Sequence, residues 1–217
     1  MAPTGTIGRP EALARTAAWV SGTVRPVFDE LLRQPGVIED WERRSPFGFL
    51  ALHGGSLERG TAEVAAEAAA RSDASLYAVR QPEELRWHIP SALVDPDASP
   101  ALAAFLAHVD VVVSVHGYGR VGFHDTLLVG GQNRELALHA ATLLRVALPS
   151  YAVVDDLARI PSDLRGLHPD NPVNRPRQTG IQVELPPRLR DGARAAPDSD
   201  ALVTALASLA TTTIGAL

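Results

Sequence analysis

The 217-residue sequence contains no lysine and no cysteine, and all 20 of its basic residues are arginines. The absence of lysine excludes Schiff-base catalysis, a Ser/Lys dyad and a P-loop lysine. The absence of cysteine excludes a thiolate nucleophile, thiolate metal ligands and disulfide bonds. The side chains that remain available for catalysis are therefore those of His, Asp, Glu, Ser and Tyr, and a bound metal would need imidazole and carboxylate ligands.

The charge and hydropathy patterns exclude several classes of partner. With a net charge of -5 and scattered arginines, the chain has no basic cluster for phosphates, so we expect no nucleic-acid partner. The first residues lack the basic region and apolar core of a secretory signal, so we expect a cytoplasmic protein. The uncharged run 201–217 is rich in Ala, Thr and Ser and predicts a packed helix, not a membrane anchor. The oligomeric state is left open.

The spacing of apolar residues predicts an α/β fold. Residues 1–45 have helical spacing and predict a helical N-terminal extension, whereas residues 46–190 alternate short apolar runs with helical segments and form the predicted catalytic domain. This alternation predicts a mixed, largely parallel open sheet flanked by helices. Residues 191–217 predict a linker and a C-terminal helix packed on the same domain, with a flexible piece at 188–200. The expected strands are PFGFLAL, SLYAVR, VDVVVSV, DTLLV, YAVV and GIQVEL, and the expected helices cover 61–71, 100–108 and 133–146.

Polar side chains follow the ends of three predicted strands. The first strand runs into the segment HGGSLERGT, which puts His53 at the strand tip and Glu58 in the next turn. The strand VVVSV ends in His116 followed by glycine, and the last strand presents Gln182 and Glu184 on one face. Functional groups collect beyond the carboxyl ends of strands in open α/β sheets, so we expect these side chains to converge.

Two imidazoles and one carboxylate would form a catalytic zinc site with an open fourth position, and Glu184 would remain as a free proton acceptor. The spacing is a weak signal by itself, because a histidine at a strand end is often only hydrogen-bonded to backbone. Glu58, taken alone, would be interpreted as a solvated turn residue. An acid in the apolar run GIQVEL, in contrast, should be paired or functional if that strand is central. We interpret the helical histidines as structural, and two loop histidines carry no further signal.

Four sequence blocks resemble the poly-γ-glutamate hydrolase family, small zinc peptidases of bacteriophages and bacteria with a carboxypeptidase A-like fold. The resemblance runs from about residue 47 to residue 190 and leaves both ends of the chain uncovered. Its order and spacing are specific. The blocks are ALHGGSLERGTAEVA, VVVSVHG, LLVGGQNRELA and HPDNPVNRPRQTGIQVELP.

Carried over residue by residue, the resemblance implies one zinc ion per chain, bound by His53, Glu58 and His116. It implies that Glu184 acts as general base and general acid. For the substrate it implies Arg175 as the group that holds a free carboxylate, since guanidinium pairs bidentately with carboxylate, with help from Asn174.

The family also has a histidine in an edge segment, which His88 in LRWHIPS matches. His88 would contact the substrate or polarise the scissile carbonyl, or else be structural. Trp87 and Pro90 flank it where the family pattern leads us to expect other residues, which makes the identity of the substrate less secure than the metal chemistry.

Three functions follow as hypotheses. The leading one is a zinc-dependent amidohydrolase or peptidase that cleaves γ-glutamyl amide bonds. The second keeps the site and acts on small N-acyl amino acids or other acyl amides. The third is a binding or accessory protein that has lost turnover, against which the intact set of ligands and acid argues. The natural substrate, its chirality, and phage or host use are left open.

Overall fold

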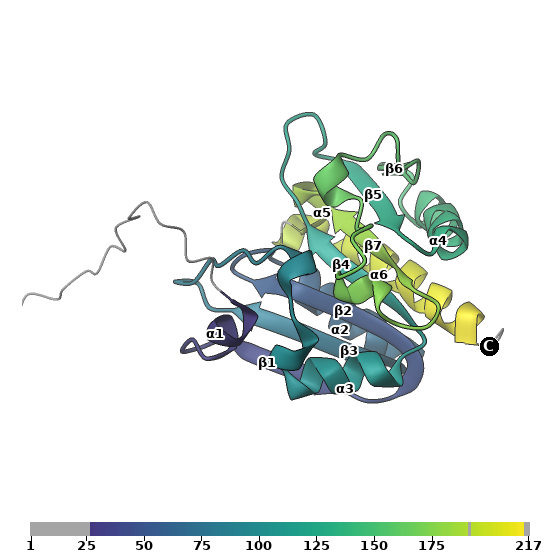
Figure 1. Ribbon diagram of the computed structural model, residues 1–217. Helices are drawn as coiled ribbons and strands as arrows, with labels where there is room; N and C mark the ends of the chain where they lie inside the picture. Colours follow the sequence, from purple (N-terminus) through teal and green to yellow (C-terminus); the bar gives the residue numbers. More distant parts are fainter. Residues whose placement is uncertain (1–26, 191, 215–217) are drawn as a thin grey trace, which may run out of the picture.

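The computed structural model describes residues 27–190 and 192–214 and contains a seven-stranded mixed sheet in the order β1-β3-β2-β4-β7-β5-β6 (Figure 1). Strands β3, β2, β4 and β7 are parallel to one another, whereas β1 is antiparallel to β3, and β5 is antiparallel to β7 and parallel to β6. The predicted mixed, largely parallel α/β sheet is therefore confirmed. The strands are β1 (Ile38–Glu42), β2 (Ser45–Gly55), β3 (Ala74–Gln81), β4 (Val111–Gly117), β5 (Thr126–Gly131), β6 (Ala152–Val154) and β7 (Gly180–Leu185).

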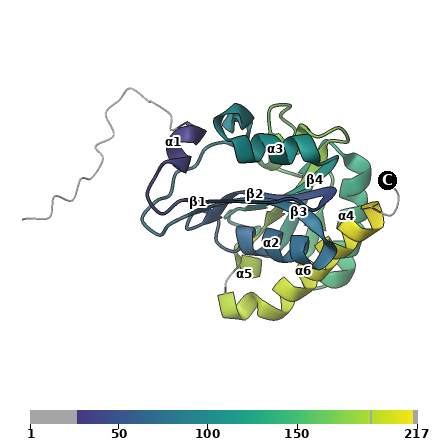
Figure 2. The same ribbon diagram turned by 90° about the horizontal axis from the view of Figure 1, so that it is seen from below.

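Helices cover both faces of the sheet. In the view along the sheet, α1 and α3 lie on one side and α2 and α6 on the other (Figure 2). The buried cluster on the α2 side also includes residues of α4, and none of these helices that the structure describes is long and apolar enough to cross a bilayer. The α-helices are α1 (Phe28–Leu32), α2 (Thr61–Ser72), α3 (Pro100–His108), α4 (Arg134–Ala147), α5 (Pro187–Arg190) and α6 (Gly192–Ile214), and short 3₁₀ turns cover Ser91–Leu93, Pro96–Ala98, Ser162–Leu164 and Pro172–Asn174.

The central strands are buried on both faces, as parallel strands between two helical layers should be. In β4, Val113 belongs to the cluster on the α2 side and Val112 to the cluster on the α3 side. The alanines of α2 allow it to pack close to the sheet, where a Cβ atom at Gly54 would lie 2.5 Å from the Cβ atom of Ala62. A cavity lies on the opposite face, near the carboxyl ends of the strands.

The prediction of a wholly helical segment before residue 46 is wrong for the part that the structure describes. After the single short helix α1, residues 38–42 form β1, an edge strand that pairs with β3. Its charged residues obscure a strand pattern, but edge strands tolerate charge, and Asp40 forms an ion pair with Arg80 of β3. Trp41 anchors β1 by packing edge-on against Phe105 of α3. The helix predicted before Pro26 lies outside the described residues.

The piece predicted to be flexible, 188–200, is helical where the structure describes it, because α5 ends at residue 190 and α6 begins at residue 192. Its flexibility stays a prediction. Tertiary contacts outweigh the Gly, Pro and charge content of this stretch. The hydroxyl of Tyr151 donates to Asp198 over 2.9 Å, and the guanidinium of Arg188 lies 5.0 Å from the centre of the Tyr151 ring. Further along α6, Leu202 and Leu206 are buried against the sheet.

Candidate metal centre

Three potential metal ligands converge at the carboxyl ends of two adjacent strands. His53 lies in β2, His116 in β4, and Glu58 in the turn between β2 and α2. All three are buried, and one ligand atom from each lies within 4.8 Å of the others. A set of two imidazoles and one carboxylate matches the ligands that catalytic zinc sites use.

A β-bulge directs His53 toward this site. Ala51 belongs to the cluster on the α2 side and Leu52 to the cluster on the α3 side, so strict alternation would return His53 to the α2 side. The pairing with β3 shifts between Ala51 and Gly54, which inserts one extra residue in β2. His53 is thereby aimed at the site, where its ring centre lies 5.0 Å from that of His116.

Glu58 places its carboxylate between the two imidazoles. Its Oε1 lies 2.9 Å from Nδ1 of His53, and its Oε2 lies 3.4 Å from Nδ1 of His116. The backbone N–H of Gly117 donates to Oε2 over 2.9 Å. The Thr61 hydroxyl donates to the carbonyl of Glu58 over 2.7 Å and holds the turn. A solvated turn residue would make none of these contacts.

The outer nitrogens of both imidazoles also have partners. Nε2 of His53 lies 2.9 Å from the carbonyl oxygen of Ile89, and Nε2 of His116 lies 3.0 Å from the Ser114 hydroxyl. Since a carbonyl oxygen only accepts, Nε2 of His53 donates to Ile89, which leaves Nδ1 as the ring atom that faces the carboxylate of Glu58. A cation between Nδ1 and the carboxylate would satisfy both, so the residues present fit a zinc ion.

The charges within the set shift the pKa values of its members. Burial alone would raise the pKa of Glu58, but the charges and hydrogen bonds of His53 and His116 outweigh it and hold that pKa well below its usual range. Burial alone would lower the pKa of His116, but the Glu58 carboxylate outweighs it and raises the pKa above its ordinary value. Glu58 is therefore ionised at neutral pH, as a ligand carboxylate must be.

Glu184 lies beside the ligands on the neighbouring strand, paired with His116 in the β4–β7 register. Burial raises its pKa to about 7, with the charge of His116 acting in the opposite direction. Nε2 of Gln182 donates to Glu184 Oε1 over 2.7 Å, and the Gln182 oxygen accepts from Asn171 over 3.1 Å. A carboxyl group that titrates near neutral pH can both accept and return a proton.

A cavity of about 640 Å³ brings Glu184 and the three ligands together. His88 stands exposed at this cavity, with its ring centre 4.9 Å from that of His53. Partial burial and the neighbouring His53 lower the pKa of His88, which keeps it neutral at pH 7. The other lining residues are Leu57, Pro90, Ser91, Ala92, Gly117, Ser162, Asp163, Leu164, Gly166, Leu167, His168, Asn171 and Gln182.

The structure does not bring the two predicted carboxylate-binding residues to the cavity lining. Asn174 is buried and donates to the carbonyl oxygens of Gly166 and His168 over 2.7 and 3.0 Å, so it supports the loop beside the cavity. Arg175 is exposed and pairs with Asp170 over 3.4 Å. The substrate role of both residues stays a prediction.

Of the residues that contact the candidate ligands and Glu184, the sequence pointed only to Gln182, although a signal exists for some of the others. Ser114 and Gln182 lie two residues before His116 and Glu184, so period-two alternation puts each on the face of its functional neighbour. Asn171 precedes a proline and accepts from the N–H of Val173, a short turn that aims its amide at Gln182. The carbonyl of Ile89 has no signal, because it depends on a loop conformation.

Comparison with known proteins connects this geometry to relatives. A curated relative, the SPbeta prophage-derived UPF0714 protein YoqZ of Bacillus subtilis (strain 168), is 34% identical over 138 residues, which cover 63% of this chain and 47% of that protein. The chain thus spans about half the length of this relative. Among solved structures, a bacteriophage poly-gamma-glutamate hydrolase has a TM-score of 0.72 at 22% identity and covers 87% of this chain and 95% of its own.

A second solved structure, described as zinc-free apo YNDL, has a TM-score of 0.66 at 27% identity and covers 82% of this chain and 93% of its own. The family model described as poly-gamma-glutamate hydrolase matches residues 28–195. This match includes β1, the turn that carries Glu58 and the whole of β7, and it extends over most of the chain. The protein therefore belongs to the poly-gamma-glutamate hydrolase family.

Proposed function

We propose that the protein is a zinc-dependent hydrolase that cleaves γ-glutamyl amide bonds. One observation carries this proposal: a buried His53, Glu58 and His116 set shares a cavity with a buried Glu184. The family is a hydrolase family, and one relative has been described in a zinc-free apo form, which favours zinc as the ion.

The roles of the residues follow from their positions. When bound, zinc supplies Lewis acidity that polarises a carbonyl group and makes water more acidic. Glu184 accepts the proton of the attacking water and returns it to the leaving amine, for which its pKa of about 7 is suited. His88, neutral at pH 7 and facing the cavity, donates a hydrogen bond to the oxygen that gains charge.

Binding of the substrate would involve the loop that ends in Arg175. Among the residues that the structure describes, its guanidinium pairs only with Asp170, over 3.4 Å at the surface, and it can exchange that partner for a carboxylate of a γ-glutamyl chain. Asn174 would act indirectly, since its two hydrogen bonds to backbone carbonyls shape the same loop.

A second candidate substrate class is the small N-acyl amino acids. The cavity lining that the structure describes includes Leu57, Leu164 and Leu167 and contains no arginine, which favours an apolar acyl group over a strongly anionic polymer. The two candidates share the metal and Glu184 and differ only in what fills the remainder of the cavity.

The test combines metal analysis with a substrate comparison. We expect about one zinc per chain, and faster hydrolysis of γ-linked oligoglutamate than of α-linked oligoglutamate or N-acyl glutamates. Faster hydrolysis of N-acyl glutamates would favour the second candidate. Absence of zinc from the purified protein and after zinc reconstitution would contradict the metal assignment, and zinc binding without hydrolysis of any amide would indicate an accessory protein.

A further inference from the structure

Arg190, the last residue of α5, binds three backbone carbonyl groups with one guanidinium. Its Nε donates to Leu185 over 3.1 Å, and its two terminal nitrogens donate to Arg59 over 3.1 Å and to Tyr118 over 3.0 Å. In the part of the chain that the structure describes, Arg190 forms no ion pair with a carboxylate. Its hydrogen-bonding capacity is directed at the backbone.

The three carbonyls belong to the segments that carry the site. Arg59 directly follows Glu58, and Leu185 directly follows Glu184. Tyr118 lies two residues after His116. One side chain thus connects the turn with the carboxylate ligand, the end of β4 with an imidazole ligand, and the end of β7 with the proton acceptor.

Gly117 shows how tightly this connection is packed. A Cβ atom at Gly117 would lie 2.5 Å from Cζ of Arg190, so only glycine admits the guanidinium at this place. The N–H of the same residue donates to Glu58 Oε2 over 2.9 Å. The glycine after His116 therefore has a packing reason that a tight turn alone does not supply.

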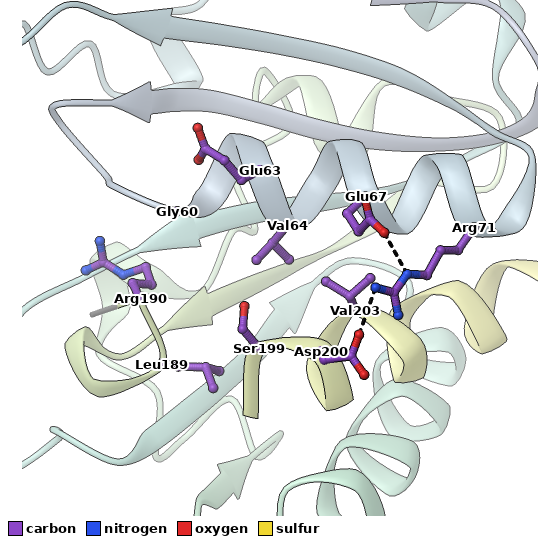
Figure 3. A pocket seen from close by; sticks show the side chains of 10 residues that line it. All are labelled: Gly60, Glu63, Val64, Glu67, Arg71, Leu189, Arg190, Ser199, Asp200 and Val203. Carbon is purple, nitrogen blue, oxygen red and sulfur yellow. Dashed lines mark hydrogen bonds and ion pairs between the residues drawn. The ribbon is translucent and has the colours of Figure 1, made fainter. Parts of the chain in front are cut away.

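A comparison with Arg71 separates Arg190 from an ordinary surface arginine. Both line a groove of about 400 Å³ between α2 and α6, on the face opposite the site, and lie at its two ends (Figure 3). Arg71 pairs with Glu67 over 2.9 Å and with Asp200 over 2.8 Å. Arg190 instead reaches from the groove to the backbone behind the metal ligands.

We propose that Arg190 is a positioning residue that holds Glu58, His116 and Glu184 in the arrangement that binds zinc. This inference rests on the proposed zinc function. Arginine suits the role because its planar guanidinium donates in several fixed directions at once, whereas lysine donates from a single nitrogen. Removing the guanidinium takes one partner from each of the three carbonyl oxygens, of which those of Leu185 and Tyr118 make partly buried contacts, and the three segments lose their common anchor.

The first test uses Arg190→Met, which keeps an unbranched side chain and removes all three hydrogen bonds. We expect zinc to bind about 10- to 100-fold more weakly in competition with a chromophoric chelator, as for other groups that orient ligands. We expect kcat to fall with KM nearly unchanged. In metal-free protein, backbone amides of residues 57–61 and 116–119 should exchange hydrogen faster. Arg71→Met, from the same groove, should leave zinc affinity and these amides unchanged.

The second test is a cycle with Gly117→Ala. Alone, this substitution should weaken zinc binding because its methyl group displaces the guanidinium, and in the Arg190→Met background it should cost much less. Additive effects would contradict the proposal. If Arg190→Met does not fold, Arg190→Lys decides: weakened zinc affinity in a folded protein supports the proposal, and wild-type affinity overturns it.

The outcomes separate this proposal from the proposed function. If the wild-type protein binds no zinc, the metal assignment fails, while the amide exchange of metal-free protein still tests whether Arg190 holds the two segments. If wild-type and Arg190→Met proteins bind zinc equally and show the same amide protection, the positioning role is wrong and the metal assignment stands.

Discussion

The two halves of the site are built differently. The ligand half is buried and each ligand atom has a fixed partner, as in the contacts of Glu58 with His53 and Gly117. The half proposed to bind the substrate, called here the substrate half, consists of loops whose charged residues pair with one another at the surface, as Arg175 does with Asp170 and Arg120 with Asp163. Exposed pairs contribute about 0–1 kcal/mol, so a ligand can displace them, whereas a buried set resists rearrangement.

This difference indicates that substitutions in the substrate half can change substrate specificity without removing catalytic activity. A buried, hydrogen-bonded set loses function when one member is removed, because the partner groups are left unsatisfied. An exposed pair tolerates replacement. Substitutions in the ligand half should therefore have large effects on metal binding and kcat. Substitutions in the substrate half should have small effects that are confined to KM.

The largest effect is expected for His116→Ala. Removing one of three protein ligands leaves a carboxylate and a single imidazole, so bound zinc should fall from about one per chain to near zero. Since the metal contributes several kcal/mol to catalysis, hydrolysis should fall by about a thousandfold or more. Metal analysis of the purified protein checks this directly.

The matched control is His139→Ala, because His139 is exposed on α4. It should keep both zinc and activity. If His116→Ala retained its zinc, the metal ligands would not be the residues of the ligand half. The distinction between the ligand half and the substrate half would then be wrong.

Glu184→Gln should separate chemistry from metal binding. The amide cannot accept a proton, so turnover should fall by about 10² to 10⁴ while the zinc content remains unchanged. The hydrogen bond from Gln182 can persist, since the new side chain retains an accepting oxygen. Full turnover in this variant would remove Glu184 from the mechanism.

Glu184→Gln should lower activity but raise the stability of the metal-free protein. Burial raises the pKa of Glu184 from 4.5 to about 7, so the native state favours the protonated form. Ionised Glu184 therefore destabilises the metal-free protein increasingly as pH rises from about 4.5 to 7, by on the order of 3 kcal/mol in total. Metal-free Glu184→Gln should melt several degrees higher than wild type at pH 8 and at nearly the same temperature at pH 4.5.

Gln182→Met tests the partner of the proton acceptor. It removes an N–H that stabilises the ionised form of Glu184, so the pKa of Glu184 should rise further. The acidic limb of kcat/KM should move to higher pH by about one unit, the equivalent of one hydrogen bond. Gln34→Met, remote from the site, is the control. An unmoved limb would mean that Gln182 does not act through Glu184.

Much of the fold could be predicted from local patterns, because the sheet is built from apolar strands such as VVVSV between helical segments. The edge strand β1 could not, since its residues IEDWE are mostly polar and its stability comes from pairing with β3 and from the contact of Trp41 with Phe105. The start of α6 was missed for the same reason, because long-range packing outweighs Gly and Pro content.

The site was partly predictable because its main residues lie at the carboxyl ends of strands or in the turn that follows. The orientation of His53 was not, since it depends on a bulge, a feature of the pairing between β2 and β3. Arg190 was missed because a guanidinium that binds carbonyl groups has no sequence motif. The substrate half is the least predictable from the sequence, because the ion-pair partner of Arg175 depends on loop conformation rather than on residue type.

The smallest effects are expected from two substitutions in the substrate half, which should change KM in opposite directions. If Arg175 binds a substrate carboxylate, its ion pair with Asp170 competes with the substrate. Asp170→Asn should then lower KM by up to about fivefold, which corresponds to the upper limit of about 1 kcal/mol for an exposed pair. Arg175→Gln should raise KM by about tenfold, and neither variant should change kcat or zinc content.

A substrate whose free carboxylate is replaced by a carboxamide provides the control. For this analogue the two variants should have the same KM as the wild type, because a neutral amide has little affinity for a guanidinium. Equal changes in KM for the two substrates would instead mean that Asp170→Asn and Arg175→Gln act by moving the loop. The carboxylate of the substrate would then be bound elsewhere, and Arg175 would not belong to the substrate half of the site.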